Sequence, residues 1–180
     1  MRLASSLVSR RRSRIVDTGV NSCDHVVTVI DTSIVQGKRV LVTGGASFIG
    51  SHLVEELVGA GADVRVADDL SSGVPENLAA VEDEIDIYQG NLKHWAFADE
   101  ATEGIDRLFH LAADHGGRGY ISNYPANCAT NMALDNIVFE TAVQNGVEKI
   151  TFASSACTYP TDIQQERQRL SAFGDCLPRV

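Results

Sequence analysis

The chain has 180 residues, of which 44% are hydrophobic and 22% are charged. This is the composition of a globular protein, and it excludes a fibrous repeat or a wholly disordered chain. Fifteen basic residues stand against 24 acidic ones, for a net charge of −9. That balance argues against a nucleic-acid partner, because such proteins carry a concentrated basic surface. The apolar runs are far shorter than the ~20 residues that span a bilayer, so we expect no membrane segment.

The N-terminal part of the chain differs in charge from the rest. Residues 1–36 contain five arginines and three aspartates, a net charge of +2, whereas residues 37–180 carry −11. We therefore treat residues 1–36 as a basic N-terminal extension, expected to be disordered, and residues 37–180 as one folded domain. The Arg- and Ser-rich first 14 residues also have the composition of an organellar transit peptide. Import into an organelle is the alternative to the cytoplasmic location that we predict.

The cysteines indicate a reducing compartment. They are widely separated and include no C-x-x-C pair, a pattern that fits neither a zinc site nor a secreted disulfide framework. We therefore expect no metal site, and free thiols at all four positions: Cys23, Cys128, Cys157 and Cys176.

The clearest pattern in the chain begins at residue 39. An apolar run over residues 39–43 predicts a buried parallel strand, and a glycine-containing turn follows over residues 44–50. Apolar residues then recur at helical spacing as far as Val58, and alternation over residues 63–68 predicts a second strand. Strand, glycine turn, helix and strand follow one another in the order of a dinucleotide-binding unit.

The ends of this unit have the chemistry to bind a dinucleotide. A tight glycine turn allows backbone N–H groups at the positive end of a helix to meet a pyrophosphate. Asp68 ends the second strand, where a carboxylate accepts hydrogen bonds from the adenosine ribose. The same carboxylate would repel a 2′-phosphate, and residues 69–75 contain no arginine, so we predict NAD rather than NADP. A structural glycine turn in an unrelated α/β domain is the alternative.

Three further strands are predicted, over residues 85–88, 106–113 and 148–153, and they alternate with helices over 91–103 and about 126–144. This alternation predicts an α/β fold with a doubly wound parallel sheet of the Rossmann type. Ligands of such sheets bind beyond the carboxyl ends of the strands. The most distinctive segments of the sequence lie at such ends: residues 44–50, 68–73, 113–121 and 154–160.

Two of these segments carry a family resemblance. The loop D-H-G-G-R-G-Y-I at residues 114–121 and the segment S-S-A-C-T-Y-P at residues 154–160 accompany the strand–turn–helix unit. Together they make the chain similar to the NAD-dependent epimerase/dehydratase family of extended short-chain dehydrogenases/reductases, and within it to the GDP-mannose 3,5-epimerase group. The resemblance covers about residues 37–170, and enzymes of this family are roughly twice as long. We therefore expect residues 37–180 to be an NAD-binding Rossmann domain that is incomplete at its C-terminus.

The resemblance implies a site for NAD and a nucleotide-diphosphate sugar. In the family, NAD transiently oxidises a sugar hydroxyl while a protein group removes and returns a proton at a neighbouring carbon. Ser155 is implied to hydrogen-bond the reacting hydroxyl and Cys157 to be an acid/base group, although a buried structural cysteine is the alternative for Cys157. A thiol suits that role because its unperturbed pKa is ~8.5. The implied cofactor contacts are Gly44, Ser47, Phe48, Ile49, Gly50, Asp68, Asn91, Leu92, Ala112 and Ala113, and the implied substrate contacts are Gly116, Gly117, Ser155 and Ala156.

The chain departs from the family pattern in three ways. Ser47 replaces the middle glycine of the turn, where its side chain either crowds a pyrophosphate or donates a hydrogen bond to it, and Asn91 replaces an aspartate. The Tyr-x-x-x-Lys pair of the family is missing, because no tyrosine has a lysine four residues later. We therefore expect an inactive chain whose full-length parent is an epimerase or dehydratase, with a homodimer as one arrangement of that parent. The alternatives are part of a UDP-sugar 4-epimerase or 4,6-dehydratase, and a non-catalytic NAD-binding module.

Overall fold

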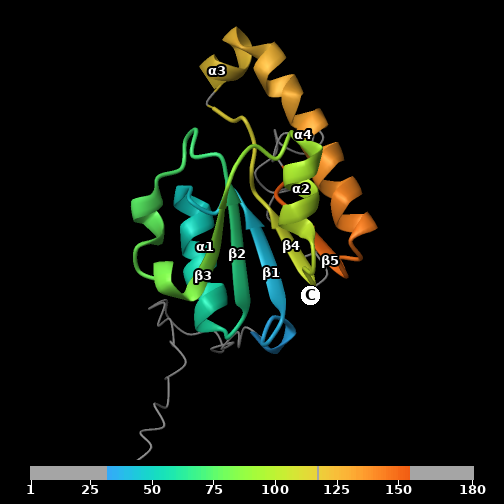
Figure 1. Cartoon of the computed structure of the whole chain (residues 1–180). Helices are drawn as coiled ribbons and strands as arrows, with labels where there is room; N and C mark the ends of the chain where they lie inside the picture. Colours follow the sequence, from blue (N-terminus) through green and yellow to red (C-terminus); the bar gives the residue numbers. More distant parts are fainter. Residues whose placement is uncertain (1–31, 117, 155–180) are drawn as a thin grey trace, which may run out of the picture. The chain divides into compact units, whose positions relative to one another are not determined.

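The computed structural model describes residues 32–116 and 118–154 of the chain. Five strands alternate with helices in chain order (Figure 1). The elements are η1 (Thr32–Ile34), β1 (Arg39–Thr43), α1 (Phe48–Gly59), β2 (Asp63–Asp68), η2 (Pro75–Leu78), η3 (Glu82–Glu84), β3 (Ile85–Gln89), α2 (Trp95–Thr102), β4 (Arg107–His110), α3 (Arg118–Asn123), α4 (Pro125–Gln144) and β5 (Lys149–Phe152).

All five strands are parallel and lie in the order β3-β2-β1-β4-β5. The chain therefore adds β2 and β3 on one side of β1, then crosses back and adds β4 and β5 on the other side. Because crossovers between parallel strands are right-handed, the two directions place their helices on opposite faces of the sheet. Figure 1 shows α1 on one side of the sheet and α2 and α4 on the other. The predicted doubly wound, Rossmann-like α/β fold is confirmed.

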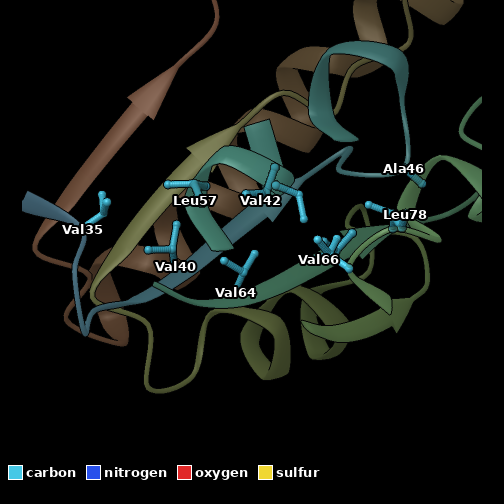
Figure 2. Packing of buried hydrophobic residues seen from close by; sticks show 10 residues of the cluster. Val35, Val40, Val42, Ala46, Leu57, Val64, Val66 and Leu78 are labelled. Carbon is cyan, nitrogen blue, oxygen red and sulfur yellow. The ribbon is translucent and has the colours of Figure 1, made fainter. Parts of the chain in front are cut away.

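The core follows from the two-residue alternation of side chains along buried strands. Val40 and Val42 of β1 pack with Val64 and Val66 of β2 and with Leu57 of α1 on one face of the sheet (Figure 2). On the other face, a second cluster of buried side chains joins the sheet to α2 and α4: Leu41, Leu108, Ala98, Leu134 and Val138. Each fully buried Val or Leu contributes about 1.5–3 kcal/mol, so both faces of the sheet are strongly held.

Residues 32–36, which the charge pattern assigns to the N-terminal extension, belong to the same compact unit as the described residues that follow them. Val35 is buried in the α1-side cluster with only 6% of its surface exposed. Gly37 then donates its N–H to the carbonyl of Gly61, which ties this segment to the end of α1. The apolar core therefore includes a segment that the charge pattern sets apart. No helix among the described residues is long and apolar enough to cross a membrane.

The glycine-rich loop expected over residues 114–121 contains a short helix, α3, which the sequence did not indicate. Glycines disfavour helix in isolation, but here side chains hold the turn together. The rings of Tyr120 and Tyr124 lie 5.0 Å apart, and the Tyr124 N–H donates to the Tyr120 carbonyl. Pro125 occupies the first turn of α4, where its missing N–H costs nothing.

The face of α4 that meets the sheet includes a polar side chain. Leu134 and Val138 are buried on this face, whereas Val143 is 71% exposed. Thr141 and Ala142 take the next positions on the buried face, about one turn beyond Val138. The hydroxyl of Thr141 donates to the Ile137 carbonyl within the helix, so burying this polar side chain leaves no unpaired group.

Candidate functional site

A cleft of about 450 Å³ lies at the carboxyl ends of β1, β2, β3 and β4. This is the edge at which ligands bind in doubly wound sheets. Strand β4 ends at His110, so the residues after it leave the sheet and form one wall. The remaining walls come from the turns after β1, β2 and β3, with one side chain each from α3 and α4. The residues that contribute are Gly44 and Ser47, Ala67 to Asp69 with Ser71 and Ser72, Gly90 to Lys93, and Leu111 to His115, together with Tyr120 and Leu134.

The turn after β1 requires glycine at two positions. Gly44 has a φ of +71°, and a Cβ on it would lie 2.9 Å from the backbone nitrogen of Ala112. A Cβ on Gly50 would collide with the carbonyl oxygen of Gly44. Gly50 itself is buried behind the turn and does not line the cleft. Backbone contact therefore closes this turn, and the glycines leave the space above it open to a ligand.

Ser47, where the family pattern has a glycine, is the N-cap of α1. Its backbone is extended, with a φ of −76°, so the position does not require glycine. The Ser47 Oγ accepts from the N–H of Gly50 at 3.1 Å and donates to the Gly44 carbonyl at 2.7 Å. The hydroxyl proton is thus used inside the turn, which argues against its donation to a pyrophosphate.

The helix end leaves two backbone donors for a ligand. The first N–H groups of a helix have no acceptor within it, and Ser47 satisfies only that of Gly50. The N–H groups of Phe48 and Ile49 stand at this end of α1, where the helix dipole favours an anion. Their side chains are 76% and 70% exposed and do not line the cleft. Only the backbone of these two residues therefore suits the predicted cofactor contact.

Asp68 ends β2, faces the glycine turn and is buried, with 7% of its surface exposed. One carboxylate oxygen accepts from the N–H of Ala46 at 3.0 Å, and the other accepts from the N–H of Leu70 at 2.9 Å. The second bond helps to hold Leu70 at a φ of +57°, in the left-handed region that side chains rarely adopt. Each carboxylate oxygen keeps a further lone pair, so Asp68 can still accept from a ligand hydroxyl.

The turn after β3 supplies four consecutive residues to the cleft, Gly90 to Lys93. The side-chain oxygen of Asn91 accepts from the N–H of Lys93 at 2.9 Å, which bends the backbone here, and Leu92 is buried. The ammonium group of Lys93 donates to the hydroxyl of Thr130 on α4 at 3.0 Å. Sequence reasoning missed Lys93, since a lone lysine after a strand carries no recognisable signal. It is the one lysine or arginine among the residues lining the cleft.

The wall after β4 is held by side chains from α3 and α4. Asn131 brackets the backbone of Asp114, accepting from its N–H at 2.7 Å and donating to its carbonyl at 2.8 Å. The Tyr120 hydroxyl donates to the Asp114 carboxylate at 2.8 Å, and this bond raises the pKa of the phenol. Asp114 and Tyr120 both line the cleft and were not predicted as site residues. Gly116 packs against the Tyr120 ring and lies outside the cleft lining.

The structure therefore gathers most of the predicted cofactor contacts around one space. Those that line the cleft are Gly44, Ser47, Asp68, Asn91, Leu92, Ala112 and Ala113. Phe48, Ile49, Gly50 and Gly116 lie beside it, whereas Gly117, Ser155, Ala156 and Cys157 fall outside the described residues. A closed glycine turn, two helix N–H groups with no acceptor among the described residues, a carboxylate and small alanine side chains are a donor and acceptor set that fits a dinucleotide.

Comparison with known proteins agrees with this geometry. A model of the NAD dependent epimerase/dehydratase family matches residues 40–176. The chain belongs to this family. The resemblance predicted from the sequence is confirmed, and with it NAD as the cofactor of the family.

Curated members of the NAD-dependent epimerase/dehydratase family include two informative relatives. GDP-mannose 3,5-epimerase 1 of Oryza sativa subsp. japonica is 34% identical over 143 residues, which are 78% of this chain and 36% of that enzyme. UDP-glucose 4-epimerase of Lacticaseibacillus casei is 33% identical over 126 residues, which are 67% of this chain and 36% of that enzyme. The chain thus spans about 36% of the length of these relatives.

Solved structures of family members share the fold. An epimerase of Methanothermobacter thermautotrophicus matches with a TM-score of 0.66 at 34% identity, over 73% of this chain and 39% of that one. UDP-glucose 4-epimerase from Brucella ovis, in complex with NAD, matches with a TM-score of 0.62 at 28% identity, over 68% and 37%. A dTDP-glucose 4,6-dehydratase from Streptomyces venezuelae, with NAD bound, matches with a TM-score of 0.58 at 30% identity, over 62% and 38%. Epimerases and dehydratases of nucleotide sugars are therefore both among its relatives.

Proposed function

We propose that this chain is the NAD-binding part of a nucleotide-sugar epimerase or dehydratase. The observation that carries the proposal is the placement of Asp68, at the end of β2, against the glycine turn and the N-terminus of α1. A carboxylate in that position accepts from ribose hydroxyls, and the helix end binds the pyrophosphate. Membership of the NAD-dependent family supports the same cofactor.

Different residues in and beside the cleft bind different parts of the cofactor. When bound, NAD supplies reversible hydride transfer. The N–H groups of Phe48 and Ile49 bind phosphate oxygens at the positive end of α1. Asp68 accepts from the ribose and disfavours a 2′-phosphate by charge repulsion. Ala112 and Ala113 are small, so the wall after β4 leaves room for a flat ring along the cleft.

The substrate side of the proposal rests on the wall after β4 and on the segment that follows β5. We propose a nucleoside-diphosphate sugar as substrate, with Ser155 hydrogen-bonding the reacting hydroxyl and Cys157 as an acid/base group. Relatives named as GDP-mannose and UDP-glucose epimerases support this substrate class. Since no tyrosine of the chain has a lysine four residues later, we propose that the chain binds NAD without turnover.

The decisive experiment is calorimetric titration of the chain with NAD and with NADP. We expect NAD to bind and NADP to bind at least about tenfold more weakly, because Asp68 repels the added phosphate. Ala113→Trp fills the cleft and should abolish NAD binding, whereas Ala133→Trp places the same ring on an exposed face of α4 away from the cleft. The proposal would be overturned if the folded wild-type chain did not bind NAD, or if the Ala113→Trp variant bound NAD as tightly as the wild type.

A second measurement distinguishes part of an epimerase or dehydratase from a non-catalytic NAD-binding module. The missing Tyr-x-x-x-Lys pair is the observation that favours the module. GDP-mannose and UDP-glucose are titrated into the NAD-loaded chain, and the products are analysed after long incubation. Binding of either nucleotide sugar without product formation would support the proposal that the chain is part of an epimerase or dehydratase. Product formation would overturn the proposed inactivity, and NAD binding with no sugar binding would favour the module.

A further inference from the structure

A buried chain of hydrogen bonds runs beneath the wall after β4. Thr43 at the end of β1 and His110 at the end of β4 are 0% and 1% exposed, and neither is among the residues that line the cleft. The Thr43 Oγ1 lies 2.6 Å from the Nδ1 of His110, and the His110 Nε2 lies 3.0 Å from a carboxylate oxygen of Asp135 on α4. The chain thus links three elements of the fold through one imidazole ring.

The backbone donors around Thr43 fix where the protons lie. The Thr43 Oγ1 accepts hydrogen bonds from the backbone N–H groups of Ala112 and Leu111, each at 3.2 Å. The Leu111 N–H also donates to the carbonyl oxygen of Thr43. A hydroxyl has two lone pairs and one proton. With both lone pairs engaged, the Thr43 proton goes to the Nδ1 of His110, and the Nε2 of His110 carries its proton toward Asp135.

The surroundings of His110 favour this neutral form. Burial lowers the pKa of the imidazole below its ordinary value, while the hydrogen bond and the charge of Asp135 oppose that change. The ring is covered by Phe139 of α4, at 5.4 Å between centroids, and by Phe152 of β5, at 5.8 Å. Asp135 is therefore the charged group that faces His110 from the described elements packed against it, and β1 contributes only the Thr43 hydroxyl.

We propose that His110 is a positioning residue for the NAD site, which in its neutral Nε2–H form orients Thr43 to hold the backbone of Leu111 and Ala112 in place. These two residues line the cleft, and the backbone of Ala112 lies against Gly44, where even one added carbon would be 2.9 Å away. A small shift of this backbone therefore narrows or widens the cleft at the glycine turn. The inference rests on the proposed binding of NAD.

Protonation of His110 disturbs this arrangement. A proton on Nδ1 must point at the Thr43 Oγ1, whose lone pairs already serve two backbone donors, so one of the N–H groups of Leu111 and Ala112 loses this acceptor. The dissociation constant for NAD is then expected to rise as the pH falls through the pKa of His110, below the ordinary value of 6.5. By linkage, bound NAD lowers the pKa of His110 further.

The test combines variants of Thr43 with nuclear magnetic resonance of ¹⁵N-labelled histidine in the whole chain. Thr43→Val removes the hydroxyl at constant shape and should weaken NAD binding about tenfold, whereas Thr43→Ser keeps the hydroxyl and should restore it. The His110 spectrum should show a neutral Nε2–H ring, with a pKa that falls on addition of NAD. This spectral readout uses the unaltered protein, so it decides the inference even if Thr43→Val does not fold.

The pH profile of NAD binding distinguishes positioning from simple stabilisation. Asp135→Asn removes the charge that favours protonation, so the acid inflection of the profile should move to lower pH. His94→Gln, on an exposed histidine outside the cleft, should leave the profile unchanged. Equal NAD affinity in Thr43→Val, or a proton on Nδ1 of His110 at neutral pH, would overturn the inference alone. A folded wild-type chain that does not bind NAD would overturn the proposed function together with it.

Discussion

Two walls of the same cleft are held in place by different physics. The turn after β1 is fixed by steric contact within a few residues, since a Cβ on Gly50 would collide with the Gly44 carbonyl. The wall after β4 has left the sheet, and it is held by hydrogen bonds from Thr43 and Asn131, which lie 69 residues before Ala112 and 17 residues after Asp114. A local steric constraint leaves a motif in the sequence, whereas a hydrogen bond between a side chain and a distant backbone group leaves none.

We expect the largest effect on stability and NAD binding from a substitution in the glycine turn after β1, which steric contact holds closed. Gly50→Ala should lower the free energy of unfolding by about 3 kcal/mol and abolish NAD binding, because the added methyl group forces the turn open. Urea unfolding and calorimetry with NAD measure both effects. Gly59→Ala is the matched control, since a Cβ at that position meets nothing within 4 Å. A Gly50→Ala variant as stable as the wild type would show that the turn is not closed by this contact.

The hydrogen-bonded wall should respond less strongly and more locally. Asn131→Ala removes both bonds to the backbone of Asp114 and should cost about 2 kcal/mol of the free energy of unfolding. Hydrogen exchange at the Asp114 amide should accelerate, while exchange in β1 changes only as much as global stability does. Asn136→Ala, on the exposed side of α4, is the control. Unchanged exchange at Asp114 would argue against the clamp.

The smallest effect is expected at Ser47, where the glycine turn after β1 departs from the family pattern. Ser47→Ala loses the N-cap of α1 and should lower the free energy of unfolding by about 1 kcal/mol. Ser47→Gly restores the residue of the family pattern and should cost only a few tenths of a kcal/mol, since glycine is a tolerated N-cap. Equal losses in the two variants, measured by urea unfolding, would mean that the cap contributes little here.

Several features of the site were predictable because they depend on neighbours in the chain. The apolar run of residues 39–43 and the apolar alternation of residues 63–68 indicated buried strands, and the glycines between strand and helix indicated a phosphate-binding turn. Asp68 was predictable from its place at the end of a strand. Its two bonds to backbone N–H groups were not, because one donor, Ala46, lies 22 residues earlier.

Other features required the folded chain. Helix α3 forms among glycines where the Tyr120 hydroxyl donates to Asp114 and the Tyr120 ring contacts the Tyr124 ring, contacts that no helix propensity of the segment expresses. Thr141 lies on the buried face of α4 while Val143 is exposed, although hydrophobicity alone would favour the valine for burial. An amphipathic stripe that includes polar residues with local hydrogen bonds is hard to read from hydrophobicity alone.

By itself, the sequence determined the order of strands and helices, the family, the glycine turn and the acidic residue that faces it. These depend on side-chain periodicity and on backbone sterics, which act between residues close in the chain. Tertiary structure alone decided the use of the Ser47 hydroxyl, the bracket of Asn131 on Asp114 and the placement of the His110 ring between Thr43 and Asp135. A hydrogen bond requires two groups to meet at about 3 Å, and only the packed sheet brings those groups together.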